Sequence, residues 1–177
     1  ETVLSKYLTA LVSEEMGTTI SLSSVSYTFF KRVQVTDLYI EDERGDTLLF
    51  SGLAKFRIKH FRPDKKQVEI RRASFEDATV NFVVDSAGVI NLKFITDRLK
   101  KPHVPPEKKN RLKISSIELI DSRFVLSREG VSGKERTIDF SDLDLRDLHI
   151  RIRDLDSYLD TIRMQITDLS AIEKSGF

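Results

Sequence analysis

The residues of this sequence that could do chemistry are few, and their spacing brings no familiar catalytic set together. The three histidines, His60, His103 and His149, lie in separate segments without a histidine partner three or four residues away, so a zinc site is not predicted. His103 lies in a proline-rich stretch, and His149 stands between two aliphatic residues of an expected strand, so both are interpreted as solvent-facing side chains. Cysteine is absent, which excludes disulfides, thiolate metal sites and a cysteine nucleophile.

Acidic residues give two further candidates for a reactive site. The series Asp142, Asp144 and Asp147 resembles the start of a calcium-binding loop. It lacks the central glycine and the later bidentate glutamate of such a loop, and leucines fill the positions between the aspartates. A strand with one charged and one apolar face explains the series better. Glu41 and Asp42 could be drawn as an acid–base dyad, yet charged residues are common at hairpin tips. Because glycine-rich phosphate loops and nucleophile elbows are also missing, we expect no catalytic residue, no metal and no cofactor.

Charge and composition restrict the class of protein further. The 177 residues carry a net charge of +1, which argues against a dedicated nucleic-acid binder. Positive charge is concentrated locally, since eight Lys and Arg residues oppose two acidic ones over 55–72, and seven oppose one over 98–113. Solvated strand faces explain such runs, and a basic patch that faces a membrane or a partner is the alternative. With 40% hydrophobic residues the chain can form a sizeable core.

The first 17 residues are predicted to form an amphipathic helix. Apolar residues recur there at spacings of three and four, which places Leu4, Leu8, Leu11 and Val12 on one stripe. Gly17 follows at the position where a left-handed residue ends a helix. No stretch approaches the roughly 20 apolar residues of a transmembrane helix, and no signal peptide is visible. The chain begins at Glu1 without Met and ends within a strand pattern, so we expect it to be a piece of a longer protein.

After the helix, apolar residues alternate with polar ones, as in strands that bury one face. A first β segment is expected over 18–97, with turns at 41–46 and 85–88 and a final strand through Ile90, Leu92 and Phe94. Residues 98–111 hold three of the four prolines and predict a solvated loop. A second β segment, over 112–177, continues the same sheet in a single domain. Residues 158–172 fit either a helix or a strand, and we favour the strand.

A six-residue pattern recurs, in which an aspartate stands between two apolar positions five residues apart. It occurs at 35–40, 75–80, 119–124 and 140–145, with Asp37, Asp77, Asp121 and Asp142 inside. Two positions an odd number of residues apart lie on opposite faces of a regular strand. We therefore predict a bulge or tight turn at each of these aspartates, which returns the apolar side chains to one face. The spacing of the units is irregular, which indicates elaborated repetition rather than a regular solenoid.

Residues 8–50 resemble the N-terminal region of TamB-type proteins of the AsmA-like superfamily. The similarity rests on a helix that ends in Glu-Met-Gly, followed by short strand motifs; the similar segments are 15–17, 19–23, 27–30, 35–42 and 44–50, with 91–97 and 173–177 further along the chain. The resemblance implies a mainly β fold with one N-terminal amphipathic helix, in which a curved antiparallel sheet forms a taco-like groove or an open β-sandwich. It also implies a periplasmic location, with an inner-membrane anchor ahead of Glu1.

Proteins of this family partner an Omp85-type outer-membrane barrel protein, and they support phospholipid transport between the inner and outer membranes and outer-membrane protein assembly. The chain is then expected to be a non-catalytic groove segment that contacts phospholipid acyl chains and binds no nucleic acid, with the N-terminal helix capping the membrane-proximal end of the groove. The expected groove side chains are apolar residues of the alternating strands: Ile20, Leu22, Phe56, Ile58, Val80, Phe82, Leu92, Ile114, Leu119, Phe124 and Ile150.

Two alternatives belong to other classes of function. One is a β-rich scaffold or interaction module with a closed core and no lipid binding, which captures a partner by adding a strand to a sheet edge. The other is an enzyme acting on a glycan or a lipid, which would need carboxylates with shifted pKa values, for instance at Asp142 and Asp144.

Overall fold

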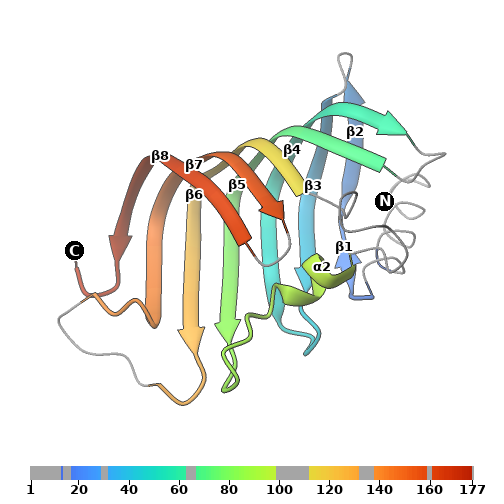
Figure 1. Ribbon diagram of the computed structural model, residues 1–177. Coiled ribbons are helices and arrows are strands. Elements are labelled where there is room, and N and C mark those ends of the chain that lie inside the picture. Colours follow the sequence, from blue (N-terminus) through green and yellow to red (C-terminus); the bar gives the residue numbers. More distant parts are fainter. Residues whose placement is uncertain are drawn as a thin grey trace.

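A single curved β-sheet makes up most of the structure (Figure 1), which is a computed structural model. It describes residue 13 and residues 17–28, 32–62, 67–98, 112–131, 138–158 and 161–176. The described elements are β1 (Ile20–Ser21), β2 (Ser24–Thr28), β3 (Arg32–Glu41), β4 (Thr47–Arg62), β5 (Gln67–Val84), α2 (Lys93–Arg98), β6 (Leu112–Arg128), β7 (Asp142–Tyr158) and β8 (Thr161–Glu173). The expectation of a mainly β fold with a curved, open sheet is therefore confirmed.

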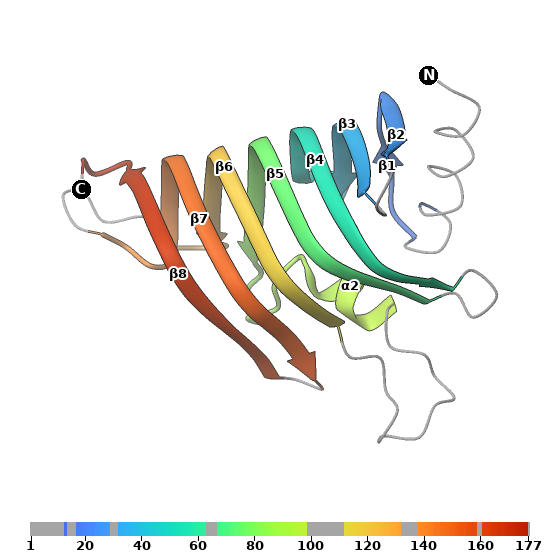
Figure 2. The ribbon, with the colours of Figure 1, turned by 90° about the horizontal axis from the view of Figure 1, so that it is seen from above.

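The strands follow one another across the sheet almost in sequence order. The order is β1-β3-β4-β5-β6-β7-β8, and β2 pairs with β3 beside β1. All neighbours are antiparallel except β5 and β6, which are parallel. A parallel pair needs a crossover that returns the chain to the starting end of the sheet. Here the crossover contains α2, which lies beneath the arch of the sheet in both views (Figures 1 and 2).

The long strands bend over the top of an arch, and left-handed residues mark the bend. Five aspartates have positive φ, namely Asp37, Asp77, Asp121, Asp147 and Asp154, with φ between 47° and 50°. Aspartate is one of the few residues with a Cβ that visits this region readily, because its short polar side chain can bond locally. The breaks predicted at Asp37, Asp77 and Asp121 are confirmed.

The fourth predicted break, at Asp142, is wrong. Asp142 is the first residue of β7, and its amide donates to the carbonyl of Asp139 (3.0 Å) at the end of a turn. A residue at the start of a strand has no earlier strand half whose phase could be reset. Two left-handed residues lie in β7, Asp147 and Asp154, and Asp147 also stands between apolar residues five apart, Leu145 and Ile150.

The left-handed residues of β3, β5 and β6 line up across the sheet, whereas Asp154 lies in the upper part of β7, away from this line. The register places Asp37 opposite Gly52, Gly52 opposite Asp77, and Asp77 beside Asp121. Strand breaks of this kind bend a strand and increase its twist, so their alignment creases the whole sheet along one line. We call the part of the sheet on the Val84 side of this line the lower limb and the other part the upper limb (Figure 1).

Buried serines supply hydrogen bonds along the crease, where the backbone ladder is interrupted. Ser51 Oγ donates to the carbonyl of Glu76 (3.0 Å). Ser122 Oγ accepts from the amide of Ala78 (3.2 Å) and donates to the carbonyl of Ile120 (2.8 Å). Because Ser51 and Ser122 are buried, these bonds satisfy backbone groups that water does not reach.

Two further predictions about strands and turns are confirmed, and one is wrong. The strand favoured near the C-terminus is confirmed as β8, and the turn at 85–88 is confirmed by Gly88, with φ of 81°. The strand predicted through Ile90, Leu92 and Phe94 is wrong. Only Ile90 pairs, through an isolated bridge to Val84; the amide of Lys93 then donates to the Ile90 carbonyl (2.9 Å) as helical turns begin. The alternation of three apolar residues was too short to distinguish a strand from a helix.

Apart from Ser13 and Gly17, the predicted N-terminal helix, with its stripe of Leu4, Leu8, Leu11 and Val12, lies outside the described residues, as does the predicted loop except for Arg98, which ends α2. Gly17 is described and has the expected left-handed conformation, with φ of 63°, and its amide donates to the carbonyl of Ser13 (2.8 Å).

The crease predicts an unusual order of stabilities for substitutions at Asp77, whose side chain is exposed. Asp77→Gly and Asp77→Asn should leave the free energy of unfolding nearly unchanged, whereas Asp77→Ala should lower it by about 1–2 kcal/mol and Asp77→Val by more, because residues with a bulkier Cβ resist positive φ. Urea unfolding followed by circular dichroism measures this. Gln34→Val, at an exposed strand position without positive φ, is the control and should cost little. Equal effects of Asp77→Gly and Asp77→Val would contradict the explanation.

Candidate functional site

The resets at the crease give the sheet one continuous apolar face. In β3, Val35 and Leu38 are three residues apart, yet both belong to one buried cluster, because Asp37 between them reverses the alternation. In β4, Leu49 and Ala54 belong to the same cluster across Gly52. The predicted consequence of the aspartate pattern, apolar residues returned to one face, is thus observed. We call this side the apolar face and the opposite side the polar face.

Aromatic pairs lie on the apolar face on both sides of the crease. Phe56 and Phe75 meet edge to face in the upper limb, with ring centroids 5.7 Å apart. Phe82 and Phe124 do the same in the lower limb, at 5.4 Å. Each pair joins neighbouring strands, β4 to β5 and β5 to β6, and such pairs add to the stability that burial of their area provides. The apolar face is therefore continuous from one limb to the other.

The apolar face is the concave one. Bending a sheet crowds the side chains on its inner face and spreads those on its outer face. The large residues of the apolar face are mostly half-buried although they form one sheet, whereas the cations that alternate with them, such as Lys55, Arg57 and Lys59, are exposed. The helix α2 on the concave side has Phe94 buried to 6% exposure. No second sheet covers the concave face within the described residues.

The structure brings most of the predicted groove residues together on this face. Ile20 and Val80 are buried, and the other nine candidates are half-buried. Two cross-strand pairs join members of the set, Val80 with Phe124 and Leu119 with Ile150, whereas Ile20 pairs with Ile40. Ile114 lies opposite Leu155. The residues of the set that sit in strands, or in the cluster beside them, are Ile20, Leu22, Phe56, Ile58, Val80, Phe82, Ile114, Leu119, Phe124 and Ile150.

One predicted groove residue is misplaced, because Leu92 lies in the turn before α2 and not in a strand. Conversely, the prediction missed large apolar residues of β8. Met164, Ile166 and Leu169 are 47%, 55% and 57% exposed, and Ile166 and Leu169 pair with Ile152 and Ile150 of β7. The alternation of apolar residues over 162–166 was the available signal, but the competing helical spacing obscured it.

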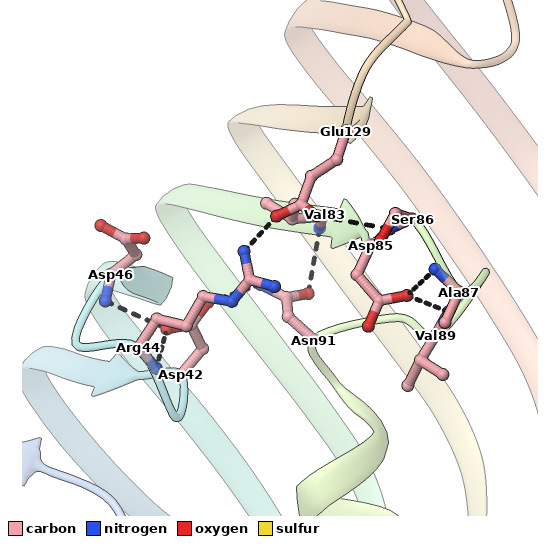
Figure 3. Close-up of polar contacts among 10 residues, drawn as sticks. All are labelled: Asp42, Arg44, Asp46, Val83, Asp85, Ser86, Ala87, Val89, Asn91 and Glu129. Carbon is pink, nitrogen blue, oxygen red and sulfur yellow. Dashed lines mark hydrogen bonds and ion pairs between the residues drawn. The ribbon is translucent and has the colours of Figure 1, made fainter.

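A network of buried and charged groups closes the lower rim of the sheet (Figure 3). Asp42, only 4% exposed, accepts from the amides of Arg44 (2.9 Å) and Asp46 (3.0 Å) and from Asn91 Nδ2 (3.0 Å). Burial by itself would raise the pKa of Asp42, but these hydrogen bonds outweigh it and lower the pKa. Asn91 Oδ1 in turn accepts from the amide of Val83 (3.1 Å). The network thus joins the 42–46 turn to β5.

The pair Glu41 and Asp42 does not form an acid–base dyad in this arrangement, because Asp42 is fully engaged as a turn acceptor. Arg44 pairs with Glu129 across the rim, and Glu129 also accepts from the amide of Ser86 (3.3 Å). Beside this network a hollow of about 500 Å³ lies between the 42–46 turn and residues 83–97. A second, shallower hollow lies on the polar face beside Tyr39 and Phe50.

The carboxylate of Asp144, the other acidic candidate, is held as an ion-pair partner on the polar face. Arg123 donates to both of its oxygens (2.8 and 2.8 Å), and Arg146 donates to Oδ2 (3.2 Å). The hydrogen bond from Arg123, with a smaller one from Arg146, outweighs burial and lowers the pKa of Asp144 to about 2. Asp142 pairs with Lys174 (2.5 Å). A general acid needs a raised pKa, so Asp144 is not suited to that role.

The histidines and the other acidic groups form no metal site within the described part of the chain, where no set of three or more candidate ligands converges. His149 is exposed, as expected, and its Nε2 lies 3.1 Å from Asp121 Oδ1. Among the described helices, none has the length and apolar character needed to span a membrane.

Comparisons with protein-family models, with curated proteins and with solved structures gave no match.

The Asp144 ion pair predicts a specific dependence of stability on pH. Because its pKa is lowered from the ordinary value of 3.8 to about 2, its contribution is complete above pH 4 and is lost as the pH falls toward 2. Asp144→Asn should lower the free energy of unfolding at neutral pH by about 1–2 kcal/mol. The value is small because both arginines are exposed, so solvent screens part of the interaction. The variant should also lose less stability than the parent between pH 4 and 2.

Urea titrations at a series of pH values test this prediction. Asp77→Asn removes an exposed carboxylate elsewhere in the sheet and serves as the control. A variant whose stability falls with acid as steeply as that of the parent would show that Asp144 does not carry this dependence.

Proposed function

We propose that the chain is a non-catalytic segment that holds lipid acyl chains against the concave, apolar face of its sheet. The observation that supports this is a continuous apolar face without a second protein layer over it within the described residues. An ordinary soluble domain covers such a face with another layer. Burial of each CH₂ group contributes about 0.8 kcal/mol, so a single acyl chain can supply the missing cover.

The length of the sheet along the axis of its arch is sufficient for an acyl chain. The axis of the arch crosses the strands from β1 to β8 (Figure 2). Seven strands side by side, about 4.8 Å apart, span roughly 29 Å. The hydrocarbon core of a bilayer is roughly 30 Å thick and contains two chain lengths, so an extended acyl chain fits along the trough. The head group would stay at the polar rim, and the chain could slide without any chemical step.

In a full-length protein, segments of this kind would carry phospholipid between the inner and outer membranes of a bacterial envelope or assist outer-membrane protein assembly. This wider proposal, with its periplasmic location, inner-membrane anchor and Omp85-type partner, rests on the resemblance of residues 8–50 to TamB-type proteins. The acyl-chain proposal rests on the apolar face alone and can be tested separately.

Lipid that co-purifies with the protein provides the test. The protein is expressed in the bacterial periplasm, and bound phospholipid is quantified by native mass spectrometry. Phe82→Asp and Phe56→Asp place a charge on the concave face, so lipid per protein should fall at least about tenfold, since a charge in a hydrocarbon environment costs several kcal/mol. Phe50→Asp, a half-buried aromatic residue of the polar face, is the matched control and should retain lipid. A lipid-free parent protein, or equal loss in all three variants, would contradict the proposal.

An interaction module that captures a partner strand is the second candidate. One observation favours it: the outer edge of β8 pairs with no other described strand, and Ile166 and Leu169 beside it are more than half exposed. An extended segment could add to this edge and cover both side chains.

Photo-crosslinking in cells separates the two candidates. A photoreactive amino acid is placed at Leu169, beside the free edge, and at Phe124, in the trough. The acyl-chain proposal predicts lipid adducts at both positions. An interaction module predicts protein adducts at Leu169 and no lipid at Phe124. A photoreactive residue at Gln34, an exposed strand position on the polar face, gives the background.

A further inference from the structure

A row of arginines crosses the polar face of the upper limb. The strand register places Arg32 of β3 directly opposite Arg57 of β4, and Arg57 directly opposite Arg72 of β5. The row passes Ser116 of β6 and reaches Arg153 of β7. Directly paired residues share a face, so these four arginines form a line across five neighbouring strands. All four are exposed.

The row has no counter-charge within the described part of the chain. None of the four arginines takes part in an ion pair or a side-chain hydrogen bond there. The next row toward the crease shows the usual arrangement, since Lys55 pairs with Glu76 (2.5 Å) and Arg151 with Glu118 (2.8 Å). The same sheet therefore neutralises its cations in one row and leaves four of them unneutralised in the next.

Like charges placed directly opposite each other on neighbouring strands destabilise a sheet, because their Cβ atoms are only about 5 Å apart. Three arginines in succession incur this repulsion twice. All four arginines of the row are exposed, so the folded state gains no burial from them. An external anion that reaches several of them at once would relieve the repulsion. Binding of an anionic ligand therefore explains the placement of these arginines better than a contribution to the stability of the fold does.

We propose that this arginine row docks the convex face of the sheet onto a bilayer surface that contains anionic phospholipid. Arginine suits this partner, since its planar guanidinium donates two parallel hydrogen bonds to a phosphate. The shape also fits, because a convex surface meets a flat one along a line, and the row is a line on the convex side. Separate lipid phosphates can then occupy successive arginines.

A nucleic acid is the less suitable partner. Its affinity depends on many neutralised phosphates and on a strongly basic field around the protein, whereas this chain has a net charge of only +1. A polyanion wider than the arginine row would also meet the acidic side chains beside it, Glu76, Glu118 and Asp168, which would repel it. The proposal uses the face opposite the acyl-chain trough, so it does not depend on the function proposed above.

Vesicle flotation tests the proposal with the whole chain. The parent should bind vesicles that contain phosphatidylglycerol, less tightly as salt is raised, and should not bind pure phosphatidylcholine vesicles. Arg57→Gln combined with Arg72→Gln should weaken binding on the order of 25-fold, since each basic residue near an anionic leaflet is worth about a factor of five. Arg128→Gln combined with Arg163→Gln removes two exposed cations outside the row and should change binding little. Phe82→Asp should bind vesicles like the parent, even if it loses co-purified lipid.

Thermal unfolding distinguishes recognition from a structural role. The Arg57→Gln, Arg72→Gln variant should melt at the same or a higher temperature than the parent, because repulsion is relieved; a lower melting temperature with unchanged vesicle binding would overturn the proposal. So would equal binding of both kinds of vesicle, or equal loss in the Arg128→Gln, Arg163→Gln variant. Displacement from vesicles by millimolar inorganic phosphate would assign the row to a free anion, and equally tight binding of a single-stranded oligonucleotide would assign it to polyanions in general.

Discussion

The whole structure depends on a constraint of the β-strand, that successive side chains point to opposite faces. A strand of 16 to 18 residues that must keep one face apolar across a bend needs a residue that reverses this alternation. In β3, β5 and β6 the reversal is made by the left-handed residues Asp37, Asp77 and Asp121, and in β4 it falls at Gly52 opposite them. The bend and the continuity of the apolar face therefore have the same cause. Without the reversals, each limb would present its apolar side chains to a different side of the sheet.

Aligning these residues has a cost, which the chain offsets locally. Each left-handed residue removes backbone groups from the ladder, and on a concave face those groups lie away from water. Ser51 and Ser122 lie next to the crease and bond the freed groups while occupying little volume among the apolar side chains. Polar atoms on an apolar face usually indicate a functional site; here both serines are explained by the hydrogen bonds of the backbone. Most other residues that share this face in the described strands are apolar, with Glu173 of β8, buried opposite Leu145, as an exception.

The strand breaks at Asp37, Asp77 and Asp121 could be predicted from the sequence, because an odd spacing of apolar residues around an aspartate has no other simple explanation in a strand. Ten of the eleven residues predicted for the groove lie in strands or in the apolar cluster beside them, since alternation assigns faces whatever the topology. It failed where the pattern was short or stood beside a turn. Asp142 matched the pattern but begins its strand, and Leu92 alternated with its neighbours but enters α2. The parallel pairing of β5 and β6 and the arginine row could not be predicted, because both depend on which strands become neighbours.

That single parallel pair decides how much of the apolar face remains open. Strands β5 and β6 both run toward the lower rim, so the chain must return to the far end of the sheet between them, and it does so with α2 on the concave side. A crossover there covers the nearby strands, where Val80, Leu48 and Phe94 are buried. Beyond β6, Met164, Ile166 and Leu169 remain exposed. The crossover therefore covers part of the apolar face beside β5, and within the described residues the large apolar side chains of this face are most exposed at β8.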